Sequence, residues 1–402
     1  MANKPKIRFK GFDDAWEQRK LGDVCSRVQG NDGRMELPTL TISASNGWMK
    51  QEDRFSGNIA GKEQKNYTLL HKGELSYNHG NSKLAKYGTV FSLQSYEEAL
   101  VPRVYHSFKV EEGNTDFIEY YFATKLPDRE LGKLISSGAR MDGLLNIGYK
   151  EFMGIQLLFP KTKEQECIAN YFRNLDHLIT LHQRKCDQMK ELKKYMLTKM
   201  FPQNGAKVPE IRFDGFIDDW EQRKLGDLVG IYDGVHQTPE YQDSGIMFLS
   251  VENIATLKSE KYISKEAFER DYKVYPEKGD ILMTRIGDVG TTNVVETAKK
   301  VAFYVSLALL KPNGINSYFL SNAMKTNAFQ KGLRERTLVT AIPQKINKDE
   351  IGKIDIFITN NDVEQQKIGA YFSTLDHLIT LHQSKCENLK NLKEYMLRNM
   401  FV

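Results

Sequence analysis

Two long stretches of the chain, residues 24–160 and 228–360, hold polar, glycine-punctuated segments whose side chains could bind the edges of nucleic-acid bases. Arg and Lys can hydrogen-bond guanine, Asn and Gln can hydrogen-bond adenine, and glycine lets a backbone approach a ligand closely. Such segments are also common as ordinary turns, so it is their presence in both stretches that favours a binding role. The candidate residues are Asn31, Tyr77, Asn78, His79, Asn81, Lys83, Arg140, His236, Gln237, Thr238, Thr284, Arg285, Asp288, Thr340, Gln344 and Lys345.

The sequence lacks the common signatures of enzyme chemistry. Residues 57–63 resemble a phosphate-binding loop, but the segment is one residue short and has no closing Ser or Thr. No Gly-x-Ser-x-Gly, His-Glu-x-x-His, Gly-x-Gly-x-x-Gly or Pro-Pro sequence occurs, so the motifs of hydrolases, zinc proteases, dinucleotide-binding enzymes and amino-methyltransferases are missing. We therefore predict no catalytic residues and no cofactor in this chain.

Metal binding is not favoured either. The four cysteines form no Cys-x-x-Cys pair, which argues against a zinc ribbon. His177 and His182 are five residues apart, and therefore about 140° apart around a helix, so one helix cannot chelate a metal with both. A site built from four histidines on two helices is conceivable, but the sequence favours polar packing for these side chains.

Composition allows a nucleic-acid partner without requiring one. The 402 residues are 40% hydrophobic and 27% charged, as in globular proteins, and the formal net charge is +5. Many dedicated DNA-binding domains are more basic. No apolar run is long enough to span a membrane, and the first residues do not resemble a secretory signal, so we expect a cytoplasmic protein.

The chain contains two long internal repeats. Residues 7–25 and 211–229 match at 14 of 19 positions, and both contain the sequence WEQRKLGD. Residues 164–201 and 364–401 match at 24 of 38 positions, including the identical LDHLITLHQ. A short alternating strand is predicted before each second repeat, at 155–159 and 354–358. The segments between the repeats scarcely align, so a repeated frame holds two different inserts.

The second repeat in each half predicts a long helix. Possible caps stand at Thr162 and Asn361, and a further cap at Ser373 would divide the second copy into a short and a long helix. Apolar positions then recur with a mean step close to 3.5, which is typical of a coiled-coil seam. From Leu175 to Phe201 this helix would be about 40 Å long. The two copies could pair with each other antiparallel, or each could dock on its own domain.

These patterns predict an α/β (α+β) protein with two globular domains joined by two long antiparallel coiled-coil helices and a pseudo-twofold internal repeat. The predicted segments are a frame segment (1–23), a first insert domain (24–160), a frame helix (161–201), a repeated frame segment (202–227), a second insert domain (228–360) and a second frame helix (361–402).

The order of these motifs resembles the specificity subunits of type I restriction–modification enzymes. The resemblance is carried by WEQRKLGD, by KGDILMTRIGDVGTTNVV at 278–295, and by EQxxI followed by LDxxI and a Lys-rich helix, in both halves. It extends over essentially the whole chain. The first insert departs most at residues 72–91, which leaves its base-contacting residues less defined than those of the second.

The resemblance implies a DNA-reading protein without catalysis of its own. Each insert would be a target recognition domain that reads one half of a bipartite asymmetric site in double-stranded DNA, and the coiled coil would set the spacer. Two modification (methyltransferase) subunits would dock on the frame, and restriction (translocase/endonuclease) subunits could join them. S-adenosylmethionine, ATP and Mg would be bound by those partner subunits.

Two other classes of function stay open at this point. A self-sufficient methyltransferase–nuclease would methylate or cleave DNA alone. A structural adaptor whose inserts bind proteins would show no sequence-selective DNA binding, even beside a modification subunit.

Overall fold

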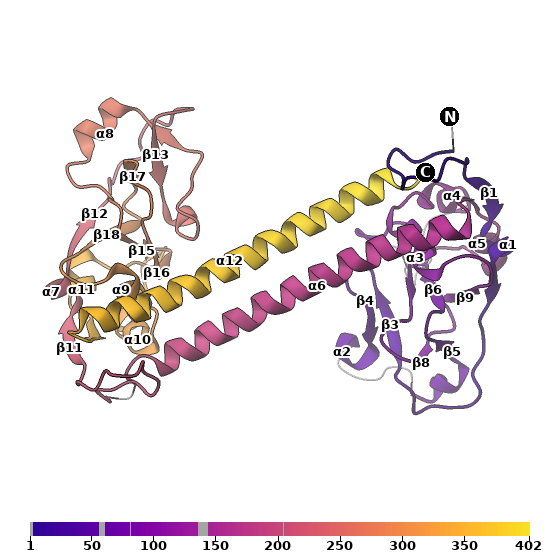
Figure 1. Cartoon of the computed structure of the whole chain (residues 1–402), viewed down its shortest axis with the longest axis horizontal. Helices are drawn as coiled ribbons and strands as arrows, with labels where there is room; N and C mark the ends of the chain where they lie inside the picture. The colour runs from indigo at the N-terminus through magenta and orange to yellow at the C-terminus, as the bar shows by residue number, and fades with distance from the viewer. Residues whose placement is uncertain (1–2, 56–60, 81, 136–143, 204) are drawn as a thin grey trace. The chain divides into compact units, whose positions relative to one another are not determined.

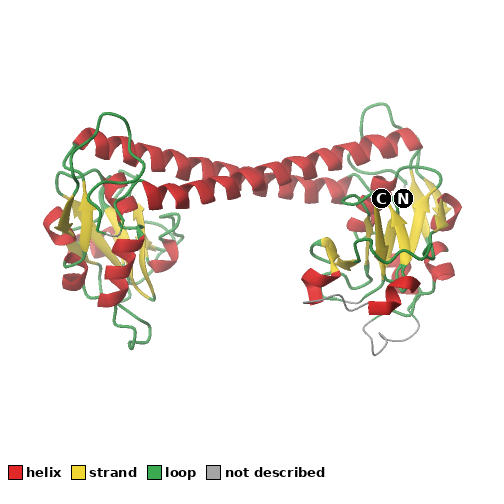
Figure 2. Cartoon of the chain, turned by 90° about the horizontal axis from the view of Figure 1, so that it is seen from below, coloured by secondary structure: helices red, strands yellow, loops and turns green. Residues whose placement is uncertain are grey.

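The computed structural model describes residues 3–55, 61–80, 82–135, 144–203 and 205–402. The chain divides into two compact units, each of which takes parts of both sequence halves (Figure 1). Unit 1 consists of Met1–His182 and Ser384–Val402, and unit 2 consists of Gln183–Gln383. Each unit mixes strands with short helices (Figure 2), so the expected α/β composition is confirmed.

Two long helices belong partly to each unit. Helix α6 spans Thr162–Lys199 and α12 spans Asp362–Asn399. The expected cap at Asn361 is confirmed, because its side chain accepts hydrogen bonds from the N–H groups of Val363 and Glu364. The expected break near Ser373 is wrong, since α12 runs through this position without interruption. A Ser side chain inside a helix does not end it when the surrounding residues keep their packing.

Within each unit, a part of α6 packs on a part of α12. In unit 1, Asp176 of α6 forms an ion pair with Lys393 of α12 at 2.5 Å, and the thiol of Cys386 lies 3.9 Å from the carbonyl oxygen of Ile179. The later residue of α6 contacts the earlier residue of α12, so the two helix segments of this unit are antiparallel. In unit 2, Lys193 of α6 pairs with Asp376 of α12 at 2.5 Å.

The expected apolar seam is partly correct. Leu175 and Cys186, and their counterparts in the second repeat, are buried as predicted. The same periodicity predicts three further residues in the seam that are about 40% exposed: Leu178, Leu192 and Leu392. A mean step of 3.5 marks the correct side of a helix, but it cannot show how much of that side a partner covers.

Unit 1 is built on four small sheets. Its largest sheet has the order β2-β9-β6-β7 with antiparallel pairing throughout. Three two-stranded sheets, β1-β10, β3-β4 and β5-β8, complete it. The strands are β1 (Glu17–Lys20), β2 (Cys25–Arg27), β3 (Leu40–Ser43), β4 (Gly47–Lys50), β5 (Thr68–His71), β6 (Leu75–Asn78), β7 (Thr89–Ser92), β8 (Glu98–Val101), β9 (His106–Val110) and β10 (Gln156–Phe159). The short helices are α1 (Leu21–Val24), α2 (Gln51–Phe55), the 3₁₀ helix Gly61–Asn66, α3 (Thr115–Ala123), α4 (Asp128–Lys133) and α5 (Tyr149–Met153).

The main sheet of unit 2 has the same strand order as that of unit 1, and the smaller sheets differ. A four-stranded antiparallel sheet has the order β12-β18-β15-β16, and a three-stranded sheet has the order β14-β13-β17, in which β13 and β17 are parallel. A two-stranded sheet, β11-β19, is separate. The strands are β11 (Glu221–Lys224), β12 (Val229–Asp233), β13 (Ile246–Leu249), β14 (Tyr262–Ile263), β15 (Ile281–Ile286), β16 (Asp288–Val294), β17 (Val301–Phe303), β18 (Leu307–Pro312) and β19 (Asp355–Ile358). The short helices are α7 (Leu225–Leu228), the 3₁₀ helix Val251–Asn253, α8 (Lys265–Asp271), α9 (Ser317–Ala323), α10 (Asn327–Arg336) and α11 (Lys348–Gly352).

The repeated frame forms the same local structure in both units. The expected strands before each long helix are confirmed as β10 and β19, and each pairs antiparallel with the EQRK segment of its own unit. The registers correspond, since Glu17 faces Phe159 and Glu221 faces Ile358. In each unit, this two-stranded ribbon therefore brings the segment before the insert next to the end of the insert.

Each unit has an aromatic core that includes the end of a long helix. In unit 1, Trp16 packs edge-on against Phe401, which follows α12, at a centroid distance of 6.1 Å. In unit 2, Trp220 packs in the same way against Phe201, which follows α6, at 5.7 Å. All four side chains are at most 5% exposed. The core of each unit thus depends on the last residues of the helix that began in the other unit.

A buried ion pair joins the first repeat to the start of the long helix in each unit. Arg8 binds both carboxylate oxygens of Glu164 at 2.6 and 2.7 Å, and Arg212 binds Glu364 at 2.6 and 2.9 Å. Both glutamate side chains are at most 2% exposed. Among the described residues, none of the helices has the length and apolar character needed to cross a lipid bilayer.

Candidate nucleic-acid interface

Several polar candidates of unit 2 lie at one end of its four-stranded sheet. Strand β12 ends at Asp233, whose carboxylate forms an ion pair with Arg285 near the end of β15. The backbone of Val235 then pairs with Phe303 and Val305, which keeps the chain after β12 beside this end of the sheet. The exposed candidates in this stretch are His236, Gln237 and Thr238.

The turn between β15 and β16 rests against residues 337–346. The N–H of Gly287 donates to the carbonyl oxygen of Gln344 at 2.9 Å, and the Gln344 amide donates back to the Gly287 carbonyl at 3.0 Å. The segment closes on itself, because the N–H of Leu338 donates to the carbonyl of Lys345 at 2.7 Å. The exposed candidates here are Asp288, Thr340, Gln344 and Lys345.

We call the seven exposed candidates of these two stretches, His236, Gln237, Thr238, Asp288, Thr340, Gln344 and Lys345, the sheet-end surface. They come from three separate parts of the sequence, and the sheet brings these parts to one end. The surface offers amide, hydroxyl, imidazole, ammonium and carboxylate groups. These are the groups that distinguish base pairs in the major groove.

Apolar residues beside this surface were missed in the sequence. Leu338, Val339 and Ile342 are 44%, 68% and 101% exposed. A signal for them exists in the sequence, because these apolar residues are interspersed with the polar candidates in TLVTAIPQK, residues 337–345. Exposed apolar side chains often mark contact sites, and some DNA-binding proteins insert such side chains between base steps.

Two candidates of unit 2 are corrected by the structure. Thr284 is fully buried in β15, where its hydroxyl donates to Asp288 at 3.2 Å and accepts from the N–H of Thr291 at 2.9 Å. Arg285 is 6% exposed and paired with Asp233, and burial lowers its pKa. Neither side chain is available to a base, so both hold the sheet end in shape.

Two candidates of unit 1 are corrected in the same way. Tyr77 is fully buried, stacks on Phe152 at a centroid distance of 4.3 Å, and donates its hydroxyl to the carbonyl of Tyr87. Burial raises the pKa of this phenol. His79 is 6% exposed, and its two ring nitrogens lie 2.8 Å from the carbonyl oxygens of Leu145 and Val104. These side chains are core residues and do not face solvent.

The other candidates of unit 1 form no comparable surface. Asn31 donates to the carbonyl of Arg34 at 2.8 Å, and Asn78 accepts from the N–H of Gly80 at 3.1 Å, so both side chains order their own loops. Lys83 is exposed. Asn81 and Arg140 lie outside the described residues.

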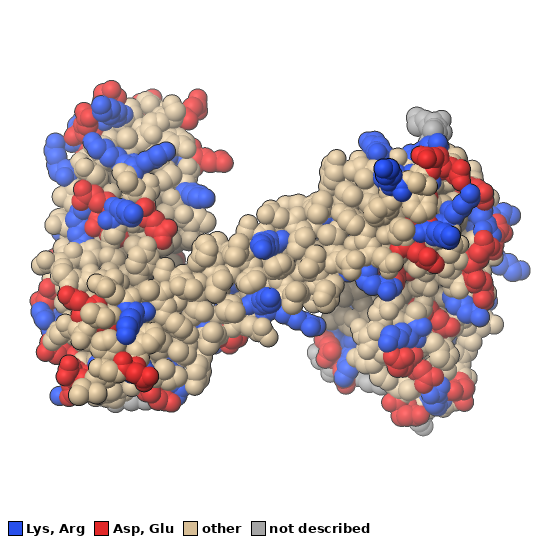
Figure 3. All heavy atoms as spheres, viewed as in Figure 1, with Lys and Arg blue, Asp and Glu red and all other residues tan. Residues whose placement is uncertain are grey.

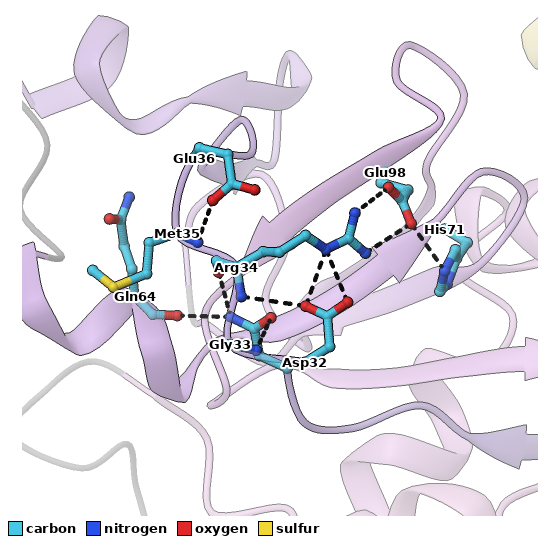
Figure 4. Close-up of polar contacts among 9 residues, drawn as sticks. Asp32, Gly33, Arg34, Met35, Glu36, Gln64, His71 and Glu98 are labelled. Carbon is cyan, nitrogen blue, oxygen red and sulfur yellow. Dashed lines mark hydrogen bonds and ion pairs between the residues drawn. The ribbon is translucent and has the colours of Figure 1, made fainter.

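A charged cluster in unit 1 was not predicted. Arg34 binds Asp32 at 2.8 Å and Glu98 at 2.7 Å, and Glu98 lies 3.3 Å from a ring nitrogen of His71 (Figure 4). The hydrogen bonds from Glu98 and Asp32 raise the pKa of Arg34. Because two carboxylates already occupy this guanidinium, the cluster orders the loop around residue 33 and is a poor phosphate site.

Basic and acidic side chains alternate over the surface of both units on the face shown in Figure 3. This agrees with the small net charge of the sequence. Specific binding to DNA would therefore depend on particular contacts more than on a broad positive field. In the part of the chain that the structure describes, no group of three or more His, Cys, Asp or Glu side chains could hold a metal ion.

The stacked pair His79 and His106 gives a prediction for pH. The pKa of His106 is lowered to about 4, mainly by burial and also by the neighbouring His79 and Arg27, while the bond to the Ile147 carbonyl opposes the shift. The neutral form is thus favoured in the folded state. Its contribution to stability is fully present above pH 6.5 and is lost as the pH falls toward 4, by about 2–3 kcal/mol.

Urea denaturation of the whole chain at pH 7 and pH 4.5 measures this loss. The variant His106→Gln cannot titrate and should lose less stability between the two pH values than the unchanged chain. Equal losses for both proteins would show that His106 does not carry the acid sensitivity of unit 1.

Comparison with known proteins finds a family whose model matches part of the chain. Residues 217–391 match the family described as the type I restriction modification DNA specificity domain. The match covers less than half of the chain and lies in its second half. For this part of the chain it agrees with the resemblance found in the sequence. No curated protein matches the sequence.

Solved structures agree with the specificity-family fold. The chain is similar to the S subunit of a type I restriction–modification system from M. genitalium, with a TM-score of 0.66, 14% identity and 99% of each chain covered. It is also similar to a chain from a study of complex assembly and conformational transition of the type I R-M system, with a TM-score of 0.50 and 15% identity over 98% of this chain and 99% of that one. At these identities the likeness shows the fold alone.

Proposed function

We propose that this chain is the specificity subunit of a type I restriction–modification enzyme and reads a bipartite, asymmetric site in double-stranded DNA, with one target recognition domain for each half. The observation that carries the proposal is that one frame, with the same β ribbon, ion pair and aromatic core, holds two inserts that scarcely align in sequence and differ in their smaller sheets. A repeated frame that holds two different inserts suits a protein that reads two different short sequences. The segments 24–160 and 228–360 are the proposed recognition domains.

In the second domain, the sheet-end surface is the proposed reader of bases. Its side chains are exposed, and the Arg285–Asp233 ion pair and the Gly287–Gln344 bonds hold their backbones in place. Loops held by a rigid scaffold are where binding residues concentrate. Leu338, Val339 and Ile342 would add apolar contacts to the thymine methyl group or to a base step.

The long helices are proposed to set the unread spacer between the half-sites. Each is one uninterrupted helix of 38 residues. Two half-sites about one helical turn of DNA apart, or 34–36 Å, lie on the same face of the duplex. A paired antiparallel coiled coil, with a pseudo-twofold relation between the halves, would hold two readers at a fixed separation of this order.

Two modification subunits are proposed to dock on the frame. Each unit exposes the same three apolar side chains of its helices: Leu181, Leu392 and Tyr395 in unit 1, and Leu381, Leu192 and Tyr195 in unit 2. Repeated apolar residues that remain exposed fit two copies of one partner. Those methyltransferase subunits would bring S-adenosylmethionine, and restriction subunits would bring ATP and Mg. Such a complex would act on DNA in the cytoplasm.

Exchange of one insert tests the proposal. Replacing residues 228–360 by the corresponding insert of another specificity subunit should change one half of the methylated site and leave the other half unchanged. Single-molecule methylation sequencing of cells that express the chimera with the modification subunit gives both halves at once.

The matched control replaces residues 24–160 instead, and it should change the other half. Loss of methylation in both chimeras despite correct folding, or a change of both half-sites in either one, would contradict the modular reading. Methylation by this chain without any modification subunit would contradict its role as a recognition subunit.

A further inference from the structure

Unit 2 contains a lysine-lined cavity away from the sheet-end surface. Its volume is about 390 Å³, and it lies among the second half of α6, the first half of α12, and the junction of α9 and α10. The side chains that matter here are Lys190, Lys193 and Lys194 of α6, Lys325 and Thr326 before α10, and Asp376 of α12.

Positive charge exceeds negative charge in this cavity. Four lysines against one aspartate leave a net charge of +3. Asp376 is already engaged, because the Lys193 ammonium contacts its two carboxylate oxygens at 2.5 and 2.7 Å. In the described part of the chain, no carboxylate lies within ion-pair distance of the ammonium groups of Lys190, Lys194 or Lys325.

Lys325 is the most confined of these lysines. Its pKa is lowered to about 8, mainly by burial and also by the neighbouring Lys193, while Asp376 opposes both effects. A buried ammonium group with little compensating charge costs stability. An anion in the cavity would remove this cost. The first turn of α10 adds positive partial charge from backbone N–H groups at the same wall.

Unit 1 has the same frame, but the charged residues at the corresponding positions differ. Asn114 and Asn316 cap α3 and α9 alike, and each backbone N–H donates to the Gln side chain of the adjoining long helix, which fixes the correspondence. By this correspondence Ala123 replaces Lys325, and by the helix repeat Glu394 replaces Lys194.

The aspartate at this position of α6 in unit 1 has an additional partner. Asp176, the counterpart of Asp376, accepts from Lys393 at 2.5 Å and from the hydroxyl of Tyr120 at 2.8 Å. In unit 2 the residue corresponding to Tyr120 is Asn322, whose amide donates to the carbonyl of Tyr318 instead. The residues of unit 1 that correspond to the cavity lining carry a net charge of +2, with Lys125, Lys390, Lys393 and Arg398 against Asp176 and Glu394.

We propose that the cavity of unit 2 is a binding site for a phosphate group. Lysine is a point-charge donor suited to phosphate, and a volume of about 390 Å³ falls within the range of small-molecule sites. The site is a property of this half of the chain, and it does not depend on the reading of bases by the inserts. The phosphate could belong to a free phosphate compound or to a nucleic-acid backbone.

Titration calorimetry of the full chain with pyrophosphate at constant ionic strength tests the site. We expect saturable binding, weakened about tenfold in Lys325→Ala, because loss of one hydrogen bond to a charged group costs about 1.5–3 kcal/mol. Lys194→Glu, which copies Glu394 at an exposed position, should weaken it at least as much. Binding should also weaken as the pH rises through 8, where Lys325, facing Lys193 and Asp376, loses its proton.

The matched control is Lys185→Glu, an exposed lysine of the same helix that does not line the cavity. Its affinity for pyrophosphate should equal that of the unchanged chain. Equal weakening by Lys185→Glu and Lys194→Glu would reveal nonspecific attraction and overturn the proposal, as would the absence of saturable binding. Displacement of pyrophosphate by a duplex that lacks the recognition site would assign the phosphate to a DNA backbone, and failure to displace it would assign a free compound.

Discussion

Replacing Glu364 by alanine is expected to lower the free energy of unfolding of unit 2 by about 3–5 kcal/mol. The Glu364 side chain is completely buried and accepts two hydrogen bonds from Arg212 and one, at 2.6 Å, from the hydroxyl of Thr359. Alanine would leave the Arg212 guanidinium, which is 10% exposed, without its counter-charge. An uncompensated buried charge is among the largest costs that one substitution can cause.

Hydrogen exchange of the backbone amides of unit 2, followed by mass spectrometry, measures this loss within one unit. The matched variant Glu164→Ala should destabilise unit 1 instead, because Arg8 and Glu164 form the corresponding pair. Glu252→Ala removes a carboxylate from an exposed pair with Lys261 and should change stability by less than about 0.5 kcal/mol. A comparably small effect of Glu364→Ala would show that the buried pair does not hold the first repeat to α12.

The substitution Phe401→Ala is expected to destabilise unit 1 by about 3–5 kcal/mol. Phe401 lies in the aromatic core, stacked on Phe117 at a centroid distance of 5.4 Å and in contact with Trp16. A smaller side chain would leave a cavity that the frame is too rigid to close. The weakened unit is the one that contains the beginning of the chain, although the substitution lies 400 residues along it.

Phe201→Ala is the matched control, since Phe201 occupies the same place beside Trp220 and Phe319 in unit 2. Hydrogen exchange should show faster opening of unit 1 in the first variant and of unit 2 in the second. If both variants weaken the same unit, the assignment of each helix end to its core is wrong.

Much of the frame could be predicted because its signals are local and occur twice. The sequence WEQRKLGD, the alternating strand and the asparagine cap each specify a short segment by its own pattern, and the structure confirms β10, β19 and the start of α12. The division of each long helix between two units could not be predicted. Which residues cover a helix face depends on the folded surroundings, and periodicity does not contain that information.

Which polar candidates are exposed could be predicted less well, for a physical reason. Thr284 and Arg285 are polar but lie within a strand, where a hydroxyl or a carboxylate satisfies them inside the protein. Tyr77 and His79 are buried beside carbonyl oxygens that accept or face their polar atoms. Polarity shows that a side chain needs a partner, but it cannot show whether the partner is DNA or the protein itself.

The composition of the two units has a consequence for the order in which the chain folds during synthesis. Unit 2 is one continuous segment, Gln183–Gln383, whereas unit 1 needs Ser384–Val402 to complete its core. Domains usually fold in the order in which they leave the ribosome. Here the order should be reversed: the half that is made first must wait, with Trp16 and Phe117 uncovered, until the final segment emerges. That interval is when this protein would be most exposed to aggregation and most dependent on chaperones.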